Sequence, residues 1–138
     1  RIGREFGATT GRPRRCGWID LPALKYAGML SGLTDLIVTK IDVMSDFAEF
    51  NACTDYEVNG KNTQELPYDL GQENLKPVYK TFPGWKKDIS HIHNFDELPS
   101  EITEYVAFLE NYLQVPITIL STGPGREEFI LKEQVSTI

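Results

Sequence analysis

An arginine-rich stretch near the start of the chain is the segment best suited to bind an anion. Residues 7–20 read GATTGRPRRCGWID and place Arg12, Arg14 and Arg15 beside two threonines and three glycines. The glycines and Pro13 disfavour a helix, and glycine lets a ligand approach the backbone closely. Arginine forks match a carboxylate or phosphate bidentately, and threonine hydroxyls add donors. The stretch is predicted to be an anion-binding loop; the alternative is an exposed basic loop without a ligand.

The distribution of charge favours a small anionic ligand for this loop. Five arginines and one glutamate give the first 15 residues a net charge of +4, whereas nine basic and 19 acidic residues give the rest −10, for a total of −6. A cationic island in a chain of pI about 4.9 attracts a small anion locally. Because the acidic remainder would repel an extended row of phosphates, nucleic acid is not expected as a partner.

A second set of polar residues follows a short apolar run. Residues 36–38 read LIV, which favours a strand buried on both faces of a parallel sheet. The TKID sequence at 39–42 would then lie at the carboxyl end of this strand, where open α/β sheets bind ligands. Asp42 could accept both the imino proton and the exocyclic amine of guanine, with the Lys40 stem along the base. The spacing resembles the N-K-x-D element of GTPases, although an ordinary strand end with a surface salt bridge has the same pattern.

A small polar turn follows another expected strand. Residues 117–120 read ITIL and predict the strand, and the turn at 121–126 reads STGPGR. Backbone donors and carbonyls of such a turn can lie against a planar base, although a turn of this composition can also serve only to reverse the chain.

Two helices are expected to support these loops. The first spans about 20–31, with Asp20 as its N-cap and Gly32 at its end, so that its positive N-terminus would add to the field of the arginine loop. The second is predicted to be capped by Ser100 and to run to about residue 113. A short helix at 45–51, capped by Ser45, is also expected.

The remaining elements are predicted from turn signals. Asn59 and Gly60 indicate a hairpin between strands at 53–58 and about 61–66. A loop is expected at 67–74, a short strand before the turn at Pro83 and Gly84, and a closing strand at 129–131. At 138 residues and 41% hydrophobic composition, the chain is long enough for one globular domain spanning residues 1–138.

Cysteine, histidine and hydropathy patterns exclude several classes of protein. No apolar run reaches the ~20 residues of a membrane helix, so no membrane association is expected. Cys16 and Cys53 are too few and too far apart for a disulfide or zinc framework, which favours a reducing, cytoplasmic compartment. His91 and His93 form an H-x-H pair, but the surrounding DISHIHNFDELP indicates a loop, and no metal site is expected. Because the sequence opens without Met inside a functional-looking segment, it is expected to be a fragment.

Four stretches, in this order, give the chain a close resemblance to the adenylosuccinate synthetase family. They are TTGRPRRCGWID at 9–20, TKIDV at 39–43, PVYKTFPGW at 77–85 and STGPGR at 121–126. The likeness extends from about Phe6 over nearly the whole chain and corresponds to the C-terminal third of that enzyme. The family ligates IMP and L-aspartate in AMP biosynthesis, with GTP hydrolysis and Mg²⁺, and forms homodimers. The resemblance implies an α/β fold with a partial mixed, mostly parallel sheet, flanking helices and a β-hairpin, as part of a larger nucleotide-binding fold.

The resemblance also implies roles for three groups of residues. In the family, the arginine at the Arg12 position also approaches IMP, and the one at the Arg14 position is associated with GTP. Pro13 replaces a fourth arginine of some members, which should leave the flanking side chains available. The aspartate-binding loop corresponds to Ala8, Thr9, Thr10, Gly11, Arg12, Pro13 and Arg14, the guanine-recognition element to Lys40, Ile41 and Asp42, and a second strip of the same pocket to Ser121, Thr122 and Gly123.

The family's phosphate loop, magnesium-binding aspartate, base and catalytic histidine have no counterpart in this sequence. GATTGR lacks the lysine and the helix start that cradle phosphates. The family mechanism phosphorylates the IMP 6-oxygen with GTP and then lets the aspartate amine displace phosphate, which needs both magnesium and a base. The chain alone is therefore expected to have no catalytic residue and no turnover, and to supply aspartate and GTP-base binding. The alternative is a non-catalytic guanine-nucleotide-binding or interaction module.

Overall fold

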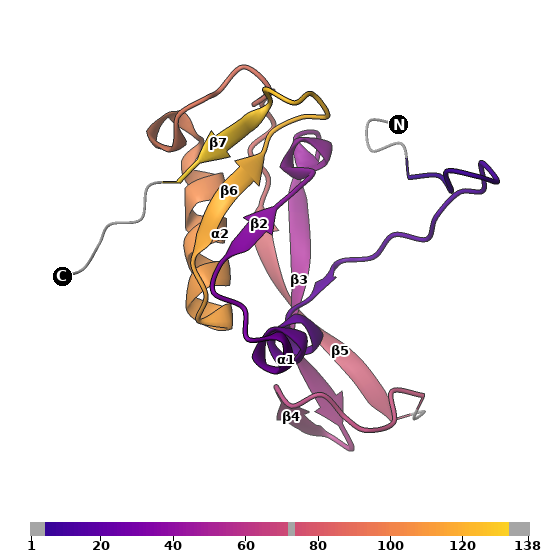
Figure 1. The fold of residues 1–138 in the computed structure, drawn as a ribbon. Helices are drawn as coiled ribbons and strands as arrows, with labels where there is room; N and C mark the ends of the chain where they lie inside the picture. Colours follow the sequence, from indigo (N-terminus) through magenta and orange to yellow (C-terminus); the bar gives the residue numbers. More distant parts are fainter. Residues whose placement is uncertain (1–4, 72–73, 133–138) are drawn as a thin grey trace.

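Two small mixed sheets and two α-helices make up the fold (Figure 1). A computed structural model describes residues 5–71 and 74–132 of the chain. The first sheet contains β1 (Ile19–Asp20), β3 (Glu49–Val58), β4 (Lys61–Thr63) and β5 (Leu75–Pro83). The second contains β2 (Leu36–Val38), β6 (Ile117–Ser121) and β7 (Phe129–Leu131). The expected α/β class, with mixed strands and a hairpin, is confirmed.

The strands pair differently from the single, mostly parallel sheet that the sequence suggested. β1 pairs with β3 and β2 pairs with β6 in parallel, whereas β4 and β5 both pair with β3 antiparallel and β7 pairs antiparallel with β6. The long β3–β5 pairing, from Glu49 opposite Pro83 to Val58 opposite Leu75, gives the first sheet an antiparallel centre. Sequence patterns reveal apolar runs but not which run lies beside which.

The first helix forms where the capping signals predict it. In α1 (Leu21–Ser31), the Asp20 carboxylate accepts the Ala23 N–H at 3.2 Å, and Gly32 ends the helix with a left-handed φ of 62°. The hydroxyl of Tyr56 on β3 donates to both Asp20 oxygens, at 2.5 and 2.6 Å. Asp20 therefore fixes the start of α1 and joins it to the first sheet.

The prediction of a short helix at 45–51 is wrong. Residues from Glu49 onward belong to β3, and a 3-10 helix, η1 (Ile41–Met44), occurs earlier in the chain. Phe50 and Ala52 alternate inward along β3 and are fully buried, as a strand requires. Pairing with β5 over the whole strand outweighs the local helix signal of Ser45, which lies just after η1.

The hairpin is confirmed, but its second strand is shorter than expected. Asn59 and Gly60 both have positive φ, 51° and 79°, which matches the two-residue turn that the Asn-Gly pair favours. β4 ends at Thr63 instead of near residue 66, and the described part of 67–74 is irregular, as predicted. β5 is longer than the short strand expected before Pro83, because β3 offers it a partner along nine residues.

The second helix, α2 (Ser100–Leu113), confirms the predicted span, with a different cap. Pro99, which has no side-chain acceptor, occupies the N-cap, and Ser100 is the first helical residue, so the expected Ser100 cap is wrong. A short 3-10 helix, η2 (Phe95–Glu97), precedes it. The fixed φ of proline suits an entry into a helix without a side-chain hydrogen bond.

An aromatic cluster fills the space between α2 and the first sheet. Phe50 of β3 stacks on Phe82 of β5 at 5.4 Å between ring centroids, and Tyr105 of α2 meets both rings edge-on at 4.9 and 5.1 Å. Ile102, Val106 and other apolar side chains of α2 join the same core. In the part of the chain that the structure describes, no helix is long and apolar enough to cross a membrane.

The buried tyrosine of this cluster predicts a loss of stability at high pH. Burial raises the pKa of Tyr105 from 10.0 to about 12, so between these values the native state keeps a proton that the unfolded chain releases. The free energy of unfolding should therefore fall as the pH rises from about 10 to about 12. Tyr105→Phe should reduce that slope by up to about 1.4 kcal/mol per pH unit. Denaturant unfolding across this range measures it; Tyr79→Phe, at a half-exposed position, is the control, and identical slopes for wild type and Tyr105→Phe would contradict the assignment.

Candidate functional site

The arginine-rich stretch is a compact loop, as predicted. Phe6 and Pro13 form a single antiparallel bridge pair, the Gly7 N–H donates to the Arg12 carbonyl at 2.8 Å, and the Arg14 N–H donates to the Glu5 carbonyl at 2.9 Å. Gly11 lies in the turn between the bridged residues with a left-handed φ of 64°. These backbone bonds hold residues 5–14 in a small hairpin that we call the arginine loop.

The arginine loop presents its side chains to solvent. Residues 8–14 are all exposed, and the Arg14 side chain is 59% exposed. Figure 1 shows the segment running from β1 away from α1, so the expected contribution of the α1 N-terminus to the field around the arginines is not supported by the fold. The cationic loop can therefore accept an anion without displacing packed structure.

One acidic residue connects the arginine loop to the end of β2. The Glu5 carboxylate lies 3.8 Å from Arg14 Nη1 and also pairs with the ammonium group of Lys40. Lys40 itself has a left-handed φ of 60° and directly precedes η1. The structure thus brings Arg14 and Lys40, which the sequence separates widely, to one carboxylate. Sequence reasoning overlooked Glu5, although it is the only acid among the first 15 residues.

The two elements expected to contact a base meet at one small cavity. Because β2 and β6 are parallel, their carboxyl ends lie at the same edge of the second sheet. A cavity of about 260 Å³ opens there, and Asp42, Thr122 and Gly123 all line it; Ser45, Asp88 and Glu128 also line it. We call this space the β2–β6 cavity. Ile41 is buried in the core and does not line the cavity, and of the second strip Ser121 is the half-buried last residue of β6.

Polar groups in the β2–β6 cavity favour a ligand that carries hydrogen-bond donors. The Thr122 side chain is 1% exposed, and its hydroxyl has no hydrogen-bond partner among the described residues. A buried hydroxyl without a partner costs free energy, which a ligand or water could recover. The carboxylates of Asp42, Asp46 and Asp88 line the same space. Such walls suit a planar group with N–H donors and repel a phosphate, whereas the nearby Lys40 and the arginine loop carry the positive charge.

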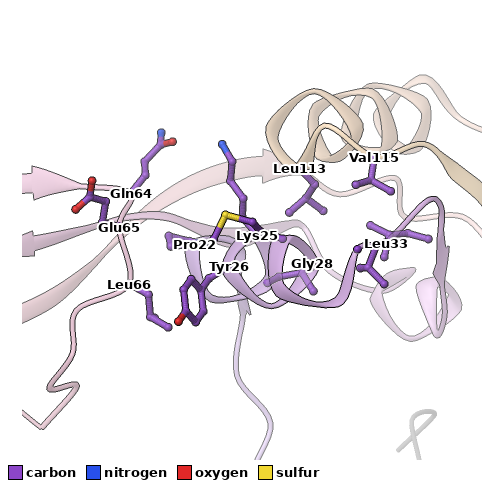
Figure 2. Close-up of a pocket in the computed structure, with 14 residues that line it drawn as sticks. Pro22, Lys25, Tyr26, Gly28, Leu33, Gln64, Glu65, Leu66, Leu113 and Val115 are labelled. Carbon is purple, nitrogen blue, oxygen red and sulfur yellow. The ribbon is translucent and has the colours of Figure 1, made fainter.

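A larger cavity lies elsewhere and contains none of the site residues expected from the sequence. It measures about 670 Å³ and is lined by residues of α1, the connection to β2, the segment after β4 and the end of α2, as Figure 2 shows. Tyr26, Leu33, Leu66 and Leu113 make its walls mainly apolar. Its polar lining residues are Lys25, Gln64 and Glu65, and because none of the expected site residues lies there, the β2–β6 cavity remains the better candidate.

Metal-binding and redox features are sparse in the described ranges. Within residues 5–71 and 74–132, no group of three or more His, Cys, Asp or Glu side chains is arranged to hold a metal ion. His91 and His93 lie in the irregular segment between β5 and η2, as predicted. Cys16 and Cys53 are free thiols, the first exposed and the second buried.

Comparison with known proteins identifies the relatives of the chain. The family profile described as adenylosuccinate synthetase matches residues 1–130. Adenylosuccinate synthetase of Cytophaga hutchinsonii is 51% identical over 132 residues, which are 95% of this chain and 31% of the relative; that of Flavobacterium johnsoniae is 48% identical, with 96% and 31% covered. The chain thus spans under a third of the length of these relatives.

A solved structure agrees with the sequence relationship. Fully ligated adenylosuccinate synthetase from Plasmodium falciparum superposes with a TM-score of 0.89 at 38% identity, over 96% of this chain and 32% of that one. The mixed fold and the resemblance noted in the sequence are confirmed. Since the family profile covers nearly the whole sequence, the chain belongs to the adenylosuccinate synthetase family.

Proposed function

We propose that this chain is the part of an adenylosuccinate synthetase that binds the guanine base of GTP and the substrate L-aspartate. The observation that carries the proposal is the β2–β6 cavity, which is lined both by Asp42 after β2 and by Thr122 and Gly123 after β6. The full protein would ligate IMP and L-aspartate with GTP hydrolysis, a step of AMP biosynthesis. Because the chain spans 31% of its curated relatives, the residues that perform the chemistry would belong to the rest of that protein.

Asp42 is proposed to select guanine over adenine. A carboxylate accepts the imino proton and the exocyclic amine of guanine together. Adenine has an acceptor nitrogen where guanine has the imino donor, so its approach to Asp42 would be repulsive. The half-buried position of Asp42 strengthens the preference, because an unmatched polar contact is more costly where water is scarce.

The positive groups outside the cavity are proposed to bind the anionic parts of the substrates. Lys40 and Arg14, which share Glu5 and do not line the acidic cavity, would bind the nucleotide phosphates. In the arginine loop, Arg12 would hold a carboxylate of aspartate bidentately and approach IMP, and the hydroxyls of Thr9 and Thr10 would add donors. Charge neutralisation of this kind stabilises the negative charge that develops during transfer.

The described residues do not fit a magnesium site, since no group of three ligating side chains is present among them. We therefore assign no magnesium ligand and no acid or base to this chain, and propose that it binds without turnover on its own. Assembly as a homodimer and a cytoplasmic location belong to the same proposal for the full protein.

The base preference can be tested by calorimetric titration of the 138-residue chain with GDP and ADP. GDP should bind at least about tenfold more tightly, since the two guanine donors find an acceptor. Asp42→Asn should weaken binding of GDP and improve binding of xanthosine diphosphate, because the hydrogen-bonding edge of xanthine matches an amide. Asp46→Asn removes an exposed carboxylate of the same cavity and should leave the preference unchanged. Equal affinities for GDP and ADP, or an unaltered preference in Asp42→Asn, would refute the assignment.

The aspartate loop can be tested in a chimera. The matching 132 residues of the Cytophaga hutchinsonii protein would be replaced by those of this chain, and turnover measured with IMP, aspartate and GTP. Arg12→Leu should lower kcat/KM for aspartate by roughly a hundredfold, because it removes a charge-assisted bidentate contact. Arg15→Leu, an exposed arginine of the same segment, is the matched control. If KM for aspartate and kcat are both unchanged in Arg12→Leu, the loop is wrongly assigned. A chimera that folds but is inactive before any substitution would favour the non-catalytic module.

A further inference from the structure

Glu128 lies beside the β2–β6 cavity and was not singled out by the sequence. It precedes β7 and follows the STGPGR turn at 121–126, which we call the glycine turn. We propose that Glu128 is a positioning residue that holds the glycine turn in the shape needed to receive the base. The inference rests on the proposed function of the cavity. It adds a residue that would affect binding of the base by fixing the position of the turn.

Three hydrogen bonds join Glu128 to the glycine turn. The backbone N–H of Thr122 donates to the Glu128 carbonyl at 2.9 Å, and the Glu128 N–H donates to the Gly125 carbonyl at 3.1 Å. The Gly125 N–H in turn donates to the Glu128 carboxylate. The bond from Thr122 closes the loop at its ends, whereas the N–H and the carboxylate of Glu128 both bond to Gly125, so that the carboxylate adds a side-chain contact that fixes the middle of the turn.

The glycines of the turn are adapted to this carboxylate. A Cβ atom added at Gly123 would lie 2.5 Å from the Glu128 carboxyl carbon, and one added at Gly125 would lie 2.7 Å from Glu128 Oε2. Real Cβ atoms do not approach other atoms so closely, so both positions need glycine as long as Glu128 occupies its place. The Glu128 side chain is therefore packed against the backbone of the turn.

The same turn lines the β2–β6 cavity together with Asp42. Thr122 and Gly123 line the cavity, and Ser121 Oγ donates to the Gly123 carbonyl at 3.0 Å. Movement of the middle of the turn would shift the Thr122 hydroxyl and the Gly123 backbone relative to Asp42. Because the Glu128 carboxylate is engaged by the Gly125 N–H, its effect on a ligand would be geometric, and an amide oxygen could replace it.

The experiment measures nucleotide affinity by calorimetry for the 138-residue chain, three single variants and a double variant with its Asp42→Asn parent. Glu128→Ala should weaken GDP about tenfold, since it frees the middle of the turn. Glu128→Gln retains an acceptor for the Gly125 N–H and should stay close to wild type. Glu127→Ala removes the same charge from the neighbouring exposed residue and should have no effect. In the Asp42→Asn background, Glu128→Ala should weaken binding of xanthosine diphosphate by the same factor as it weakens GDP binding in the wild-type background. The reason is that the turn does not contact the hydrogen-bonding edge of the base.

A second readout follows the turn itself. Amide hydrogen exchange at Gly125 should be about tenfold faster in Glu128→Ala than in wild type, with near-normal protection in Glu128→Gln. Unchanged exchange in Glu128→Ala would overturn the inference whether or not nucleotide binds. So would equal loss of GDP affinity in Glu128→Gln and Glu128→Ala, which would assign the effect to charge. A wild-type chain that binds no GDP would instead overturn the proposed function, while exchange at Gly125 would still decide whether Glu128 holds the turn.

Discussion

The parallel pairing of β2 with β6 is the constraint on which the candidate site depends. Parallel strands end at the same edge of a sheet, so the residues that follow them are brought together however far apart they are in sequence. Asp42 follows β2 by four residues, and Thr122 comes directly after β6. A shift of this pairing would separate the two walls of the cavity and leave each as an isolated loop.

The hydrophobic core beside the first sheet contacts the β2–β6 cavity through Trp85 and Ser45. Trp85 packs edge-on against Phe50 in the aromatic cluster, and its indole N–H donates to Ser45 Oγ at 3.1 Å. Ser45 follows η1 and lines the β2–β6 cavity, while Ile41 of η1 is buried in the core. The core around α2 therefore contacts η1 and the residue after it. Because Asp42 belongs to η1, packing around α2 also affects the position of Asp42.

The candidate site separates negative from positive charge, as the proposed binding of a nucleotide requires. Carboxylates line the β2–β6 cavity, whereas the cations of the arginine loop do not line it, and Glu5 pairs with both Arg14 and Lys40. A base with N–H donors is attracted to the first region, and phosphates or substrate carboxylates are attracted to the second. The sequence already concentrates positive charge in its first 15 residues, and the fold gathers the carboxylates of Asp42, Asp46 and Asp88 around one cavity.

Features that depend on neighbouring residues were determined by the sequence alone. Asp20 and Gly32 delimit α1, and Asn59-Gly60 forms the hairpin turn, because capping and positive φ act within a few residues. The arginine loop and the residues beside the cavity could likewise be named from motifs. Only the tertiary structure decided that 45–51 is not a helix, that the strands form two sheets, and that Glu5 and Glu128 hold the loops. These outcomes depend on which distant segments pair, and the free energy of pairing and burial outweighs the local preferences that a sequence displays.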